Sequence, residues 1–379
     1  MDRVTAVRSN SAVRLVPVVV SAILIGATAC ASPQKQVPVA GPDTGHRPAL
    51  FYAKDGAVYV SDPAGTPGRK LTDGPADTDP APSPDGSRLA FVRKGSRADG
   101  GGELWVMDLS NDSAPAGPPR RLVDPRELVP NFEGDDPARS IVRNPRWSPA
   151  GDRIAFLKAS GNGGFLLTAA AGTGKVETPP RPLYADEHYA WAPDGKRIAW
   201  VAGRMDVSPV NVSVLTVGEG SQPVATGANA DSVDYADGGR SLVFANSDAN
   251  GTAYRATPFT IRDGGIYTIE PPAAPRPVFT GSGAYADVAA LWKGAVGFTQ
   301  WSADQKTKSI QVVKPGAAPH TIADTRSDAP GPQWVGETVA YVGTADDRPL
   351  LITTDESESG PTKEPQRIDV GVDAFAWGD

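Results

Sequence analysis

The chain has 379 residues, a formal net charge of −7, and 41 glycines and 37 prolines that follow no collagen-like period. This composition is typical of a turn-rich globular protein, and 40% hydrophobic residues are enough to fill a core. The acidic balance argues against a nucleic-acid partner, and the single cysteine excludes an internal disulfide.

The N-terminus has the three-part layout of a secretory signal peptide. Three arginines precede the apolar run "LVPVVVSAILIGATA", which is short for a transmembrane helix and ends in small residues. We therefore predict a signal peptide over residues 1–29 and an exported protein.

The stretch "LIGATAC" resembles a lipobox, in which small residues precede a cysteine that becomes lipidated. The match departs from the pattern at Ala27, where leucine is preferred. The resemblance implies lipidation of Cys30 and an anchor at the outer face of the cytoplasmic membrane. The alternative is ordinary cleavage after Ala29, which would release a soluble protein. Residues 30–47, rich in Pro, Gly and polar residues, are predicted to be a flexible tether.

Apolar triads recur after short turns from about residue 48 onward and define an internal repeat. Their first members are separated by 65, 44, 44, 54 and 43 residues, which gives a period of about 44 with insertions before the second and fifth triads. The triads are Leu89–Phe91, Ile154–Phe156, Ile198–Trp200, Leu242–Phe244, Val296–Phe298 and Val339–Tyr341.

Each repeat contains four short β-rich runs. The first ends in a large residue and leads into a turn such as "SPDG", where Pro sets φ and Gly tolerates a positive φ. The triad, a run such as "ELWVMD" and a closing run such as "RRLVD" follow. Four strands in about 44 residues describe a blade, so we predict an all-β fold, a β-propeller over residues 48–379.

The first repeat lacks its first strand, and the C-terminal "VDAFAWGD" supplies a matching one. We predict that this segment pairs into the first blade and closes a ring of seven blades, which removes exposed sheet edges.

The phrase formed by Trp147–Phe156, "WSPAGDRIAF", resembles the Pro-Asp-type, WD-like repeat of TolB-like propellers, which also occurs in dipeptidyl peptidase IV-like and prolyl oligopeptidase-like enzymes. The resemblance implies the fold and leaves the function open, because propellers host unrelated activities. We expect neither the α/β domain that precedes the TolB propeller nor the hydrolase domain of the peptidases.

Catalytic and metal-binding motifs are missing from the sequence. It contains no G-x-S-x-G, and the three histidines, His46, His188 and His320, have no second His or Cys at zinc-site spacing. "NSDANG", at Asn246–Gly251, resembles part of a calcium loop but is better read as a polar turn. We predict no metal and no cofactor.

Two sets of residues at the repeat positions have a structural explanation and a functional one. The tryptophans Trp147, Trp191, Trp334 and Trp377 share one repeat position, where packing between blades is favoured over ligand stacking. The carboxylates Asp231, Asp234, Asp287 and Asp328 lie near first strands and are candidates to line a central pore.

The two insertions are the predicted binding loops, because long loops on a rigid scaffold commonly carry function. The larger, Asp124–Asn144, offers Phe132. The smaller, Ala249–Gly265, offers Tyr254, Arg255 and Phe259. An exposed aromatic residue beside an arginine is a plausible contact hot spot.

The sequence favours a monomeric, non-enzymatic, lipid-anchored propeller that binds an envelope protein or a secreted ligand. Two alternatives stay open. One is a propeller enzyme, such as a lyase, a lactonase or a glycan-cleaving enzyme, with an acidic site at the pore, and the other is a module that binds wall glycans.

Overall fold

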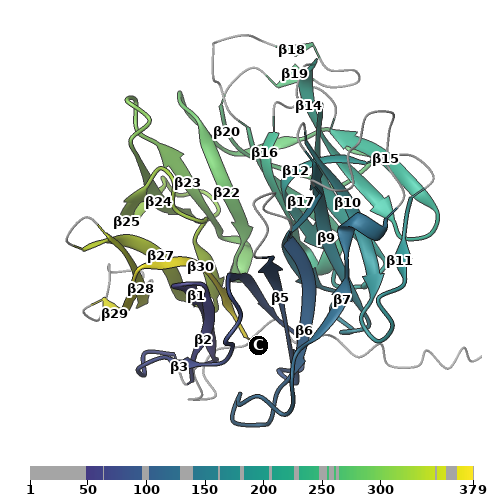
Figure 1. The fold of residues 1–379 in the computed structure, drawn as a ribbon. Coiled ribbons are helices and arrows are strands. Elements are labelled where there is room, and N and C mark those ends of the chain that lie inside the picture. The colour runs from purple at the N-terminus through teal and green to yellow at the C-terminus, as the bar shows by residue number, and fades with distance from the viewer. Residues whose placement is uncertain are drawn as a thin grey trace, which may run out of the picture. The chain divides into compact units, whose positions relative to one another are not determined.

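The computed structural model describes residues 48–62, 64–95, 102–128, 140–160, 163–179, 183–204, 207–225, 230–246, 254–255, 260–261, 264–345, 348–355 and 365–378. These residues form seven four-stranded antiparallel blades around a common axis, as the repeat predicts (Figure 1). None of the described residues belongs to a helix with the length and apolar character needed to cross a membrane.

The blades follow one another along the chain, and each is listed here from its innermost to its outermost strand. The first four are β30 (Val372–Trp377), β1 (Leu50–Lys54), β2 (Ala57–Ser61) and β3 (Arg69–Lys70); β4 (Asp77–Pro82), β5 (Arg88–Lys94), β6 (Gly102–Asp108) and β7 (Arg120–Val123); β8 (Ile141–Trp147), β9 (Arg153–Ser160), β10 (Gly163–Ala170) and β11 (Val176–Glu177); and β12 (Tyr184–Trp191), β13 (Arg197–Arg204), β14 (Val207–Thr216) and β15 (Gly220–Ala225).

The last three are β16 (Ala230–Ala236), β17 (Ser241–Asn246), β20 (Gly265–Ile269) and β21 (Arg276–Thr280); β22 (Tyr285–Ala290), β23 (Val296–Trp301), β24 (Thr307–Val313) and β25 (His320–Arg326); and β26 (Gln333–Val335), β27 (Thr338–Ala345), β28 (Arg348–Asp355) and β29 (Gln366–Val370). A small hairpin of β18 (Tyr254–Arg255) and β19 (Thr260–Ile261) and three short 3-10 turns, η1 (Pro125–Glu127), η3 (Asp237–Gly239) and η4 (Trp292–Gly294), complete the described elements.

The ring is closed by the two ends of the propeller, which confirms the prediction for the C-terminal segment. Strand β30 pairs antiparallel with β1, from Leu50 opposite Trp377 to Lys54 opposite Val372. In Figure 1 the yellow β30 lies beside the purple β1. Four strands per blade and a shared first blade therefore leave no innermost strand unpaired.

The repeated turn is held by its own serine and aspartate. In the second blade Ser83 Oγ donates to Asp85 Oδ1 at 2.6 Å and accepts the Arg88 N–H at 2.9 Å, while Gly86 has a φ of +68°. The serine and aspartate thus satisfy polar groups of the tight turn, and glycine takes the left-handed conformation that other residues avoid. This turn starts the strand.

The third blade keeps this turn although alanine replaces the aspartate. Ala150 stands where Asp85 would be, and Ser148 Oγ donates instead to Asp152, two residues further on, at 2.7 Å. The exchange is tolerated because any nearby carboxylate can accept the serine hydroxyl.

Tryptophan side chains link three of the inner strands to the inner strand before each of them. Trp147 Nε1 donates to the carbonyl of Ala81 at 2.8 Å, and Trp191 Nε1 donates to the carbonyl of Arg146 at 3.1 Å. Trp377 makes the same bond to Gln333 at 3.1 Å. The prediction that these residues pack between blades is confirmed, and the equivalent bonds show that neighbouring inner strands run parallel to one another.

Candidate functional site

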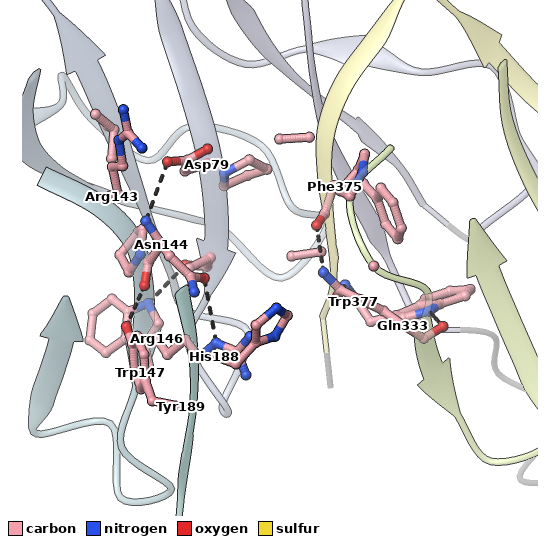
Figure 2. A pocket seen from close by; sticks show the side chains of 18 of the residues that line it. Asp79, Arg143, Asn144, Arg146, Trp147, His188, Tyr189, Gln333, Phe375 and Trp377 are labelled. Atoms are coloured by element: carbon pink, nitrogen blue, oxygen red, sulfur yellow. Dashed lines mark hydrogen bonds between the residues drawn. The ribbon is translucent and has the colours of Figure 1, made fainter. Parts of the chain in front are cut away.

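A cavity of about 760 Å³ lies on the axis of the propeller. Its wall is formed mainly by the innermost strands, here β4, β8, β12, β16, β22, β26 and β30. Figure 2 shows two groups of its residues on facing walls, one around Arg146 and His188 and the other around Phe375 and Gln333. The volume falls within the range of small-molecule pockets, roughly 300–1,000 Å³.

One repeat position supplies a ring of residues around this axis, and all of them except Ser232 line the cavity. The position lies four residues before the residue that begins each inner turn, such as Ser83 or Ser148. Five successive blades have a polar residue there and the last two have a small one: Asp79, Asn144, His188, Ser232, Asp287, Gly331 and Ala374. The ring is therefore polar over five blades and apolar over two.

Three ring members have a left-handed backbone. The φ of Asp79 is +49°, that of Asn144 is +47° and that of Asp287 is +51°, and each lies at a register shift of its strand. Asn and Asp tolerate this conformation better than other non-glycine residues. The bulge that it forms is what turns these side chains out of the regular alternation of the strand.

Two carboxylates at the axis accept hydrogen bonds from backbone N–H groups. Asp79 Oδ2 accepts the N–H of Asn144 at 3.3 Å. Asp234 accepts the N–H of Tyr235 at 2.8 Å through Oδ1 and that of Ala290 at 2.9 Å through Oδ2. Burial raises the pKa of the Asp234 carboxyl, although these two bonds oppose the rise. Both aspartates thus hold adjacent inner strands in register.

Asp287 belongs to a buried ion pair. Its Oδ2 accepts a 2.7 Å hydrogen bond from Thr299 Oγ1 and lies 3.0 Å from Lys308 Nζ. The side chains of the pair are 8% and 6% exposed. Lys308 also donates to the carbonyl of Ala329 at 3.2 Å, so that both charges are compensated where water has little access.

His188 is the one ring member that carries an imidazole. Its Nε2 lies 3.9 Å from Asp231 Oδ1 and 4.0 Å from Asp287 Oδ1, and its side chain is 32% exposed. These separations exceed hydrogen-bond length. Within the described ranges no group of three His, Cys, Asp or Glu side chains is arranged to hold a metal ion.

The facing wall of the cavity is mostly apolar. It includes Pro330, Pro332, Phe375 and Ala376. Gln333 lies among them with its amide used internally, because Nε2 donates to the carbonyl of Phe375 at 2.7 Å and Oε1 accepts the Trp377 N–H at 3.3 Å. The cavity therefore has one polar side and one apolar side.

The residues predicted to line the pore are only partly placed there. Asp234 and Asp287 line the cavity, and Asp231 lies beside His188. Asp328 does not contribute to the wall, because its carboxylate forms a bidentate pair with Arg326 at 2.6 and 2.8 Å on the exposed surface. That candidate was wrong, since the residue precedes the inner strand by several positions.

The predicted loop residues and the lipidation site are not tested by these contacts. Cys30, Phe132 and Phe259 lie outside the described residues, as does most of "NSDANG". Tyr254 and Arg255 form β18, paired with Ile261 and Thr260, and only their backbone is described. The sequence reading overlooked Arg143 and Arg146, which line the cavity and could have been found by counting back from the turn serine.

Both insertions connect strands at the same face of the propeller. The larger joins the end of β7 to the start of β8, and the smaller joins the end of β17 to the start of β20. Because strands alternate in direction within each blade, both connections lie where the innermost strands begin. We call this end the insertion face, and the opposite end, which carries the Ser83–Gly86 turn and its equivalents, the turn face.

Comparisons with known proteins give a fold and no closer relationship. No protein-family model matches the chain, and no curated protein matches it. Among solved structures, TolB from Acinetobacter baumannii is 14% identical with a TM-score of 0.52, and the match covers 87% of this chain and 83% of TolB.

Two similar structures are enzymes or putative enzymes. A putative 6-phosphogluconolactonase from Bacteroides uniformis is 12% identical, with a TM-score of 0.54 and coverage of 88% of this chain and 99% of the other. A puromycin-hydrolyzing peptidase from Mycobacterium tuberculosis is 14% identical, with a TM-score of 0.56 and coverage of 86% and 53%. At such identities the likeness concerns architecture, and on that ground the chain is a seven-bladed β-propeller with a TolB-like fold.

Proposed function

We propose that this protein is an exported, lipid-anchored propeller that binds an envelope protein or a secreted ligand at its insertion face and catalyses no reaction. The observation that carries the proposal is the state of the axial carboxylates. Asp79 and Asp234 accept backbone N–H groups of the neighbouring inner strand, and Asp287 pairs with Lys308. An acidic active site needs carboxylates that are free to exchange protons or contact substrate, and these are engaged.

The connection to the tether supports an orientation of the binding face. The carbonyl of Ala49 accepts the Gly378 N–H at 2.7 Å, so the propeller begins beside the end of β30, on the turn face. A tether that leads to a lipid on Cys30 would leave from this face. The insertion face would then point away from the membrane, toward partners outside the cytoplasm.

A site-specific crosslinking experiment tests the binding face. A photo-reactive residue replaces Arg143, which is exposed at the start of β8, and in a matched variant it replaces Arg240, which is exposed beside η3 on the turn face. Discrete adducts formed in the native envelope from the Arg143 position alone support the proposal. Equal adducts from both positions, or none from either, overturn it. Variants of Phe132 and Tyr254 extend the test to the insertions.

Mass spectrometry of the mature N-terminus tests the anchor separately. A diacylglyceryl-modified Cys30 supports lipid anchoring, and a Cys30→Ala variant should then lose membrane association. An unmodified Cys30 in a soluble secreted fraction refutes the anchor and leaves the binding proposal to the crosslinking result.

The enzyme alternative depends on His188, which lies near two carboxylates at the axis. A general base needs such a partner to set its charge and orientation. If a lactone, a polyuronate or a glycan is turned over, a His188→Gln variant should lose that turnover while it stays folded. Retention of activity in this variant removes the alternative.

A further inference from the structure

Three cationic side chains line one part of the axial cavity. Lys94 ends β5, and Arg143 and Arg146 lie on β8 in the next blade. The chain as a whole carries a formal charge of −7, so this grouping differs in sign from the average surface. A cleft lined by one sign of charge attracts ligands of the other sign.

Arg146 is the centre of this group. Its side chain is exposed within the cavity, its Nε lies 3.5 Å from Asn144 Oδ1, and its Cζ lies 5.3 Å from the centroid of the Tyr189 ring. In the part of the chain that the structure describes, Arg146 forms no ion pair and its two Nη groups donate no hydrogen bond. The guanidinium is therefore oriented by its neighbours and keeps its fork of donors for a ligand.

Two carboxylates of the cavity wall do not take up this charge. Asp234, whose charge interacts with Arg146, uses both oxygens for backbone N–H groups of Tyr235 and Ala290. Asp287 is balanced by Lys308. An incoming anion would meet carboxylates that are already compensated.

The rest of the cavity suits a chain rather than a bare ion. Its volume, about 760 Å³, and an apolar wall that includes the partly exposed Pro330 and Ala376 leave room for several bonded atoms beside the charged group. Figure 2 shows Arg146 and His188 on one wall and Phe375 and Trp377 on the other. Low polarity on that side strengthens an ion pair formed opposite to it.

We propose that the axial cavity binds a carboxylate-bearing peptide segment, with Arg146 as the bidentate contact of the carboxylate and the wall that includes Pro330 and Ala376 as the contact of an adjacent apolar side chain. Arg143 and Lys94 add to the positive field. A planar guanidinium matches a carboxylate through two parallel hydrogen bonds, which a lysine cannot reproduce. The inference rests on the proposed binding function and names the chemistry of the partner segment.

The test uses the full mature chain and three sets of N-acetylated hexapeptides with apolar residues. The first set ends in a free carboxylate, the second carries an internal Glu and an amidated C-terminus, and the third is amidated and uncharged. Binding is measured by calorimetry and by tryptophan fluorescence. Binding of the first or second set without the third supports the proposal and identifies the source of the carboxylate. Equal binding of the uncharged set, or no binding of any set, overturns it.

The variants assign the contact to Arg146. An Arg146→Met change should lower the affinity for carboxylate peptides by about 10- to 100-fold, which is the loss expected for charge-assisted hydrogen bonds. It should leave the affinity for uncharged peptides unchanged. The affinity of Arg146→Lys for carboxylate peptides should lie between those of the unchanged protein and Arg146→Met, because lysine keeps the charge and the Tyr189 contact. Arg276→Met removes the same charge from the exposed outer strand β21 and is the matched control. An Arg146→Met variant that binds like Arg276→Met contradicts the assignment.

Failure here and failure of the proposed function give different results. Crosslinks at the insertion face with no carboxylate-dependent peptide binding would overturn the axial site alone. The absence of face-specific crosslinks would overturn the proposed function itself.

Discussion

Arg88 of the second blade lies over the Trp147 ring of the third, with its Cζ 4.5 Å from the ring centroid. Arg88 also donates through Nη2 to the carbonyl of Gly151, in the turn of the third blade, at 2.7 Å. Arg197 repeats the arrangement two blades later, with a 3.1 Å bond to Gly239 and its Cζ 5.6 Å from the Tyr235 ring. In these two cases the arginine that follows the repeated turn therefore links its blade to the next one.

Replacing this arginine should destabilise the propeller. Arg88→Met keeps the apolar stem but removes the cation–π contact and the bond to Gly151, and we expect a loss of about 1–3 kcal/mol in the free energy of unfolding. Urea denaturation measures the change. Arg153→Met is a natural comparison, because the one ion-pair partner of Arg153 among the described residues is Glu177 of its own blade, at 3.5 Å, and the change should cost less than about 1 kcal/mol. Equal losses in the two variants would contradict the interblade role.

A glycine explains the one irregular triad of the repeat. The middle residue is Ala or Val in the other five triads and Gly297 in the fifth, where a Cβ would lie 2.8 Å from Cε2 and Nε1 of the Trp334 ring. We expect Gly297→Ala to cost about 1–3 kcal/mol of stability through overpacking. The measurement is the urea midpoint, and Gly117→Ala, with open space around it, is the control.

A second substitution identifies the cause of that loss. Trp334→Phe removes the indole atoms nearest to Gly297, so the double variant should recover part of the stability lost in Gly297→Ala relative to Trp334→Phe alone. Simple additivity of the two losses would show that the ring contact is not responsible.

The sequence predicted the fold because the information needed for it is local and repeated. Each blade encodes its own turn and its own apolar triad, and a one-residue shift of a strand would turn its apolar residues outward. The closing strand was also predictable, since "VDAFAWGD" carries the same pattern as the other first strands.

The candidate site was harder to predict because it forms from one residue of each blade. Asp79, Asn144 and Asp287 face the axis because their strands bulge there, and the alternation of residues along a strand does not predict a bulge. The position of Arg146 follows from the repeat, but its lack of an ion-pair partner within the described residues depends on where the neighbouring blades place Asp234. Such relations between distant segments are a property of the assembled ring.

The hydrogen bonds of Asp85 in the repeated turn should make the stability of the protein depend on pH. Hydrogen bonds from Ser83 and Ser87 lower the pKa of the Asp85 carboxyl to about 2, below the value near 3.9 of an unfolded chain. A lowered pKa in the folded state means that the stabilisation is complete above the unfolded pKa and is lost as the pH falls from about 4 toward 2. Because Asp85 is exposed, we expect less than about 1 kcal/mol.

Urea titrations between pH 2 and 6 check this expectation. Asp85→Asn should flatten the acid side of the stability curve. Asp373 gives a control of opposite sign, because burial and the charge of Asp55 raise its pKa, and Asp373→Asn should be neutral or stabilising near pH 7. An unchanged acid slope in Asp85→Asn would contradict the turn assignment.

The buried pair of Asp287 and Lys308 should behave as a coupled unit. Lys308→Met leaves the Asp287 carboxylate 8% exposed with Thr299 as its remaining partner, and we expect a loss of about 3–5 kcal/mol, as for other buried pairs broken on one side. Asp287→Asn is the suitable second change, since Asn tolerates the φ of +51° and keeps a group that Thr299 can reach. The double variant should be more stable than Lys308→Met alone, because no uncompensated charge remains buried.

Lys306→Met, which removes an 81% exposed lysine two residues away, should change stability by no more than about 0.5 kcal/mol. Additive losses in the double variant would show that the two charges do not depend on each other.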